Sequence, residues 1–180
     1  MGINDRSLTA EQILLVQSEA HLLKKINVEA VQQITADGFH VIMITSNHPS
    51  MILSKMYARA DINPEKIFFI DAITNYALGK DEPDTENTLY ISNPADLTYI
   101  GMALTKAMNK WKDKDVCIVV DSISTMLIYV SSTKTSKFLH YLTNKIRLSD
   151  VHGVLFAAKD GLDPGFMLQL TTFVDEIIEE

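Results

Sequence analysis

Eight residues that begin at Ser18 stand where a phosphate-binding loop would lie, because a short apolar run typical of a buried strand ends just before them, at Val16. A Walker A motif, G-x-x-x-x-G-K-[ST], needs two glycines so that backbone N–H groups converge on phosphate oxygens, and a hydroxyl that binds magnesium. The lysine of the motif is present as Lys24. Its glycines are replaced by Ser18 and Leu23, and its hydroxyl residue is replaced by Lys25. We therefore expect this loop to bind a triphosphate poorly or not at all.

Polar residues also follow the other apolar runs of the chain. Open α/β sheets bind ligands in the crevice outside the carboxyl ends of their strands, so these residues define a candidate ligand site. The candidates are Ser18, Asn47, His48, Asp71, Asp121 and Lys159. Strand ends are polar in any such fold, which leaves a structural interpretation open. In that interpretation Asp121 caps the turn that begins at Ser122 or pairs with a neighbouring hydroxyl, and Asp71 bonds to the loop that follows it.

A metal site or a hydrolase centre is the weaker interpretation of these residues. A metal would need His21 and His48 together with a carboxylate, and histidines in loops are more commonly exposed to solvent. No G-x-S-x-G nucleophile elbow follows any of the apolar runs. Cys117 is the only cysteine, which excludes an internal disulfide and a cysteine zinc site, and its apolar neighbours predict a buried side chain. We expect no bound metal.

The length and charge of the chain limit the classes of protein to which it can belong. A chain of 180 residues is predicted to form one domain, 1–180, and a domain of this size buries about 70% of its unfolded surface. The 16 basic and 23 acidic residues give a net charge of −7, which argues against nucleic acid binding because phosphate contacts need a basic face. The N-terminus lacks a basic segment followed by an apolar one, and no run approaches the roughly 18 apolar residues of a membrane span. We expect a soluble, cytoplasmic protein that does not contact membranes.

The elements that must position the candidate residues alternate along the chain. Strand-like runs rich in β-branched residues occur at 13–16, 40–45, 67–71, 88–91, 116–121, 153–158 and 173–178. Helical patterns lie between them at 27–36, 50–60, 95–111, 134–147 and 164–170. This alternation predicts an α/β fold in three layers, with helices on both faces of a mostly parallel sheet. The acidic stretch 75–87 is predicted to be a solvated loop.

Taken together, these segments resemble the RecA-like ATPases of the KaiC type, which share the P-loop NTPase fold, over essentially the whole chain. Gly38 precedes the second strand run, HVIMIT, as in that family, and CIVVDSIS matches its Walker B strand, with Asp121 at the end and Ser122 after it. The sequence is most similar to small, uncharacterised archaeal and bacterial KaiC-like proteins that share segments such as ITSNHP, LYISNPADL and FVDEII. This resemblance implies a RecA-like sheet and no known activity.

The departures from the active members of this family predict a loss of catalysis. Active KaiC-type enzymes end the second strand with acidic residues, one of which activates the attacking water, whereas this chain has Thr45-Ser46-Asn47-His48. Phosphoryl transfer depends on positioning and on metal-assisted charge stabilisation, and the cradle, the magnesium ligand and the base are all replaced. We expect a non-enzymatic pseudo-ATPase without a cofactor, acting as a regulatory or signalling module that senses a ligand at the crevice. The alternative is an ATP-binding protein or slow ATPase that holds ATP and magnesium through Lys24 and Asp121.

The apolar segment TMLIYV, at 125–130, follows the Walker B strand directly. KaiC-like proteins have a loop and a short helix there, near the subunit interface, and exposed apolar surface often marks an interface. The candidate interface residues are Met126, Leu127, Ile128 and Tyr129. We expect self-association or a protein partner, and a purely structural subunit is the further alternative.

Overall fold

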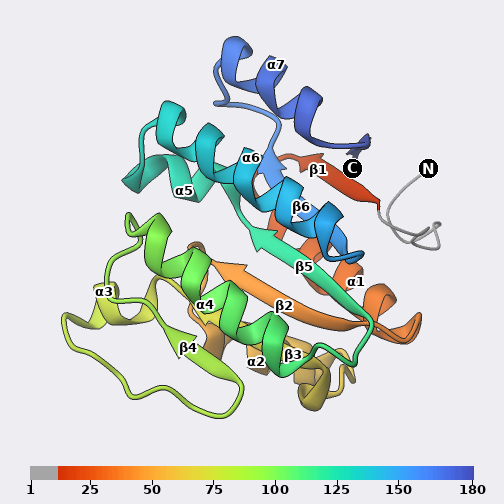
Figure 1. Ribbon diagram of the computed structural model, residues 1–180, viewed down its shortest axis with the longest axis vertical. Helices are drawn as coiled ribbons and strands as arrows, with labels where there is room; N and C mark the ends of the chain where they lie inside the picture. Colours follow the sequence, from red (N-terminus) through yellow and green to blue (C-terminus); the bar gives the residue numbers. More distant parts are fainter. Residues whose placement is uncertain (1–11) are drawn as a thin grey trace.

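The described part of the protein forms a seven-stranded parallel sheet with helices on both faces (Figure 1). This computed structural model describes residues 12–180. The strand order is β4-β3-β2-β5-β6-β1-β7, and all pairs of neighbouring strands are parallel. The strands are β1 (Ile13–Ser18), β2 (His40–Thr45), β3 (Ile67–Asp71), β4 (Thr88–Tyr90), β5 (Val116–Asp121), β6 (His152–Ala158) and β7 (Glu176–Glu179). The predicted three-layer α/β/α fold is confirmed.

The helices divide between the two faces of this sheet. They are α1 (Leu23–Ala36), α2 (Ser50–Arg59), η2 (Pro64–Lys66, a 3-10 turn), α3 (Thr74–Leu78), α4 (Leu97–Lys110), α5 (Ile123–Tyr129), α6 (Ser132–Leu148) and α7 (Pro164–Phe173). Buried side chains of α1 and α2 pack into one apolar cluster, and those of α4, α5, α6 and α7 pack into another. Figure 1 shows α4 and α6 in front of the sheet and α1 and α2 behind it.

The strand sequences are continuous apolar runs because helices cover both faces of the sheet. In β5, Ile118 and Val120 pack against the cluster that contains α4 and α6, while Cys117 and Val119 pack against the cluster that contains α1 and α2. Side chains alternate between the faces of a strand, so Asp121 is on the α1 and α2 side of the sheet. This places the strand-end carboxylate beneath those two helices.

Side chains cap the first turn of several helices. These caps set where the loops at the carboxyl edge of the sheet end. The Ser122 hydroxyl and Thr125 form a reciprocal capping box at the start of α5. Asp96 caps α4 by accepting a hydrogen bond from the backbone N–H of Tyr99, and Asp163 caps α7. The first helix, α1, starts without a side-chain cap.

Two predicted segments differ from the structure, and a third agrees with it. The stretch 75–87 is not wholly irregular, since it begins within α3, which ends where Gly79 adopts a left-handed conformation, with φ of 65°. The segment 125–130 lies mostly in α5, a short helix of the kind that the resemblance implied, and the capping box at Ser122 starts it. The last strand run was predicted to begin at 173, but Phe173 ends α7 and β7 begins at Glu176.

Two expectations about membranes and targeting concern different parts of the chain. Among residues 12–180, no helix combines the length and the hydrophobicity that crossing a lipid bilayer requires. The expected absence of a leader sequence rests largely on residues 1–11, which lie outside the described residues.

Candidate functional site

The loop between β1 and α1 is a tight turn of four residues, 19–22. The backbone N–H of Leu22 donates to the carbonyl of Glu19 over 2.9 Å, and the hydroxyl of Ser18 donates to the same carbonyl over 3.1 Å. Ser18 itself is fully buried as the last residue of β1. A Walker A loop directs free backbone N–H groups at phosphate, whereas this turn uses one of them internally and buries the first motif position.

The second motif glycine is replaced by a core residue. Leu23 is 6% exposed and packs in the apolar cluster between the sheet and α1. Lys24 and Lys25 are exposed, and Lys25 pairs with Glu29 at 3.6 Å. ATP and magnesium are the group that this fold implies, and the residues present do not fit it. The loop lacks both glycines of the cradle, the metal-binding hydroxyl is absent, and the second glycine position holds a leucine whose side chain is anchored in the core.

Asp121 lies at the centre of a polar cluster at the end of β5. Its carboxylate is 2% exposed. The Asn47 side-chain amide donates to Oδ1 over 3.2 Å, and Nδ1 of His48 lies 3.8 Å from Oδ2. That separation is beyond hydrogen-bond range, and within residues 12–180 Oδ2 has no hydrogen-bond partner. A buried carboxylate oxygen without a donor is costly, so this oxygen can bind an added donor or cation.

The loop after β2 is held rigidly against Asp121 by hydroxyl groups. The Thr45 hydroxyl donates to the His48 carbonyl over 2.7 Å and accepts from the His48 backbone N–H over 3.2 Å. Ser46 and Thr125 are joined by a hydroxyl–hydroxyl bond of 2.9 Å, which ties the loop to α5. Asn47 and His48 are therefore fixed beside the carboxylate by the segment that replaces the family's acidic strand end.

Two residues that the sequence analysis did not single out form a buried polar pair within the electrostatic reach of Asp121. Tyr57 in α2 donates its hydroxyl to Oδ1 of Asn27 in α1 over 2.6 Å, and both side chains are buried. Burial raises the pKa of Tyr57 well above its usual value, and the negative charge of Asp121 raises it further, while the hydrogen bond to Asn27 opposes the rise. Tyr57 therefore remains a hydrogen-bond donor. The amide nitrogen of Asn27 has no hydrogen-bond partner in the described part of the chain.

Asp71 plays the structural role considered for it, and this interpretation is confirmed. Its carboxylate accepts backbone N–H bonds from Ser50 at 2.7 Å, Ile73 at 3.0 Å and Thr74 at 2.8 Å. The Thr74 hydroxyl donates a fourth bond of 2.6 Å. These bonds tie the end of β3 to the starts of α2 and α3, so Asp71 is satisfied within the protein.

The remaining candidates make contacts of their own, away from the Asp121 carboxylate. Ser122 caps α5, and the competing prediction that Asp121 caps this turn is wrong. Lys159 pairs with Glu179 at 3.4 Å. His21 pairs with Glu19 at 3.3 Å, and residues 12–180 contain no group of three or more side chains arranged to hold a metal ion.

The candidate interface residues of α5 divide between core and surface because the segment is helical. Met126 is 1% exposed, so its assignment to an interface is wrong, and Leu127 packs partly buried against the core. Ile128 is 70% exposed. The Tyr129 ring meets Tyr76 of α3 edge-on, with ring centroids 5.4 Å apart.

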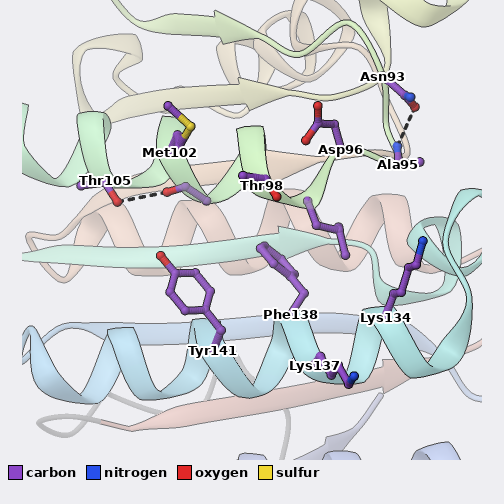
Figure 2. Close-up of a pocket in the computed structure, with 12 residues that line it drawn as sticks. Asn93, Ala95, Asp96, Thr98, Met102, Thr105, Lys134, Lys137, Phe138 and Tyr141 are labelled. Carbon is purple, nitrogen blue, oxygen red and sulfur yellow. Dashed lines mark hydrogen bonds between the residues drawn. The ribbon is translucent and has the colours of Figure 1, made fainter.

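A separate groove of about 790 Å³ lies between α4 and α6, on the opposite face of the sheet from α1 and α2 (Figure 2). Phe138 and Tyr141 project from α6 toward α4 in this view. The groove is lined by Asn93, Ala95, Asp96, Leu97, Thr98, Gly101, Met102, Thr105, Lys134, Lys137, Phe138 and Tyr141. None of the predicted site residues lines it. The lining residues lie in α4, in the segment just before it and in α6, and no motif in the sequence pointed to them.

Comparison with known proteins places this geometry in context. The model of a family of unknown function, DUF7504, matches residues 12–180. The chain is similar to the crystal structure of the uncharacterized protein PH0321 from Pyrococcus horikoshii, with a TM-score of 0.73 and 13% identity over 96% of this chain and 78% of that one. It is also similar to the KaiC-like protein PH0186 from Pyrococcus horikoshii OT3, with a TM-score of 0.63 and 15% identity over 97% of this chain and 73% of that one. No curated protein matches the sequence. At these identities the likeness shows a KaiC-like, RecA-type fold alone.

Proposed function

The chain belongs to the DUF7504 family of unknown function, and we propose that it is a KaiC-like regulatory or protein-interaction module that does not transfer phosphate. In this proposal it is a degenerate, P-loop-less member of a fold whose active members are ATPases. A protein partner or a second copy of the chain is the ligand through which it acts. A small molecule at the Asp121 cluster is the signal to which it responds.

The burial of Leu23 is the observation that carries this proposal. Phosphoryl transfer needs a backbone cradle, a magnesium ion and a positioned water or base. Here a 6% exposed leucine replaces the cradle glycine, Lys25 replaces the metal-binding hydroxyl, and Asn47 and His48 replace the acidic strand end. Three required groups are replaced at separate points of one site. Loss of phosphoryl transfer explains this pattern better than compensation by other residues.

The solved structure of PH0321 is described as a complex with an unknown peptide. That protein shares the fold of this chain at 13% identity. Its peptide supports the interaction part of the proposal only by showing that a protein of this fold can hold one.

Release of inorganic phosphate from magnesium-ATP tests the proposal. The wild-type protein should release phosphate no faster than the Asp121→Asn variant, because neither possesses the groups that the reaction needs. Turnover by the wild type that is lost in Asp121→Asn would show an active site built on the Walker B position and would overturn the proposal. Turnover that persists in the variant would identify a contaminating ATPase, which repurification removes.

The second candidate is an ATP-binding protein that uses a non-standard phosphate contact. The observation in its favour is that Asp121 Oδ2 is buried without a hydrogen-bond partner among residues 12–180, while Lys24 is exposed. Equilibrium binding of ATP with magnesium to the wild type and to Lys24→Ala separates this candidate from the first. Saturable binding that Lys24→Ala weakens at least tenfold supports the second candidate.

A further inference from the structure

The two helices that wall the α4–α6 groove carry an unusual charge pattern for this protein. The whole chain has a net charge of −7, yet neither α4 nor α6 contains an aspartate or a glutamate. Lys134 and Lys137 lie in the first two turns of α6, where positive charge is disfavoured because the amino end of a helix is itself positive. Within residues 12–180, neither lysine forms an ion pair, and both are exposed.

The groove between these lysines and α4 is lined by apolar and polar side chains, and its apolar part comes from both helices. Phe138 is buried at its floor, while Met102 is 60% exposed and Tyr141 is 45% exposed on its two sides. Gly101 has no side chain to fill the space, and a Cβ at that position would meet the Tyr141 ring at 3.5 Å. Exposed apolar side chains gathered in one hollow often mark a binding surface.

A third lysine, Lys145, bonds to a residue that lines the groove. Lys145 donates to the Thr105 hydroxyl over 2.9 Å, which bridges α6 to α4, and its Nζ lies 5.8 Å from the centre of the Tyr141 ring. The lining contains one acidic residue, Asp96, whose carboxylate caps α4, and two lysines, Lys134 and Lys137, so its formal charge is +1. The charge that the groove presents to an occupant is therefore positive, next to an apolar strip.

We propose that this groove docks an acidic amphipathic helix of a partner protein. Charge complementarity selects the acidic occupant, because Lys134 and Lys137 lack counter-charges within the described chain. The groove runs between two helices that lie side by side (Figures 1 and 2), and such a groove receives the apolar face of a third helix at i, i+3 and i+4 spacing. Carboxylates of that helix pair with the two lysines, and its apolar side chains cover Met102 and Tyr141. This inference rests on the proposed interaction function and names its partner class.

Selection from a phage-displayed library of random 16-residue peptides tests this docking surface. The full chain is the bait, and the enriched peptides are synthesised with a fluorescent label. Enriched sequences should have net negative charge and apolar residues at helical spacing. Their affinity, measured by fluorescence anisotropy, should fall at least tenfold in Lys134→Glu/Lys137→Glu and also in Met102→Asp. It should also fall as salt is raised, because exposed charge pairs are screened.

The matched control is Lys55→Glu/Arg59→Glu, which makes the same charge change at exposed basic residues of α2, on the opposite face of the sheet. Its affinity for the peptides should stay within twofold of wild type. Circular dichroism confirms that each variant is folded. The docking proposal would be overturned if the selection failed to enrich acidic peptides. It would also be overturned if wild type and Lys134→Glu/Lys137→Glu bound the enriched peptides with equal affinity. Both results are independent of the proposed loss of catalysis, which the phosphate-release assay tests separately.

Discussion

Two buried aspartates, Asp71 at the end of β3 and Asp121 at the end of β5, should respond very differently to truncation. Both are nearly inaccessible to solvent. Asp71 accepts four hydrogen bonds of 2.6–3.0 Å, three of them from backbone N–H groups. Asp121 accepts one bond, of 3.2 Å from Asn47, and its other oxygen has no hydrogen-bond donor among residues 12–180.

The cost of each substitution follows from the donors that it leaves behind. Asp71→Ala strands three buried backbone N–H groups, each worth about 1–3 kcal/mol when unsatisfied, and the losses are not additive because they share one acceptor. We expect Asp71→Ala to lower the free energy of unfolding by about 3–5 kcal/mol. Asp121→Ala releases one amide, which water can reach from the partly exposed Asn47, and removes an unsatisfied buried oxygen. We expect its free energy of unfolding to stay within about 1 kcal/mol of wild type.

Guanidinium unfolding followed by circular dichroism measures both variants. The midpoint should shift strongly for Asp71→Ala and slightly for Asp121→Ala, with unchanged slopes. Equal losses in the two variants would show that the Asp121 carboxylate is a structural group, and would contradict its assignment as the free group of a ligand site.

Three further predictions concern the loop after β1, the candidate interface in α5 and the pKa of His40. Leu23→Ala should cost about 2–5 kcal/mol because it opens a cavity in the core, whereas Lys24→Ala should change stability by less than about 0.5 kcal/mol; thermal unfolding compares them. Ile128→Lys should leave the fold intact and weaken self-association in analytical ultracentrifugation, whereas Met126→Lys should unfold the protein by burying a charge. Burial, reinforced by nearby lysines, lowers the pKa of His40 below 6.5, so the unfolded chain binds the proton more tightly. Stability from this group is complete above about pH 6.5 and is lost as pH falls toward the lowered pKa, so His40→Gln should lose less stability on acidification in denaturant titrations.

Each of these predictions has a clear contrary result. Equal stabilities of Leu23→Ala and Lys24→Ala would mean that the turn after β1 can open to admit a ligand. A folded Ile128→Lys variant with the assembly state of the parent at every dilution would exclude a self-association role for α5. Parallel pH profiles of wild type and His40→Gln would show that His40 titrates alike in the folded and unfolded chain.

The fold could be predicted from the sequence because its strands are buried on both faces. Such strands are continuous apolar runs, and the bounds of β2, β3 and β5 agree with the predicted ranges 40–45, 67–71 and 116–121. Strand direction then placed Asn47, His48 and Asp121 at one sheet edge, where the structure brings them into contact. Because parallel strands all end at one edge of the sheet, this part of the site can be predicted from the sequence alone.

The parts that could not be predicted depend on packing between elements distant in sequence. The bond from Tyr57 to Asn27 requires α1 and α2 to lie against each other, and each residue alone looks like a member of an ordinary helix face. The α4–α6 groove likewise arises only when two helices become neighbours. Local signals for the bounds of two short helices were present, however. The Ser122-x-x-Thr125 spacing marked the start of α5, and Gly79 marked the end of α3.

Thermal unfolding of the protein with and without magnesium-ATP tests the central claim, loss of the nucleotide site, most directly. A ligand at 100 times its dissociation constant stabilises the folded state by about 2.7 kcal/mol, which for a chain of this size raises the melting temperature by about 5–10 °C. We predict an unchanged melting temperature at millimolar magnesium-ATP, for the wild type and for Asp121→Asn alike. A rise of several degrees in the wild type that disappears in Asp121→Asn would contradict the account, because it would place a working nucleotide site at the end of β5.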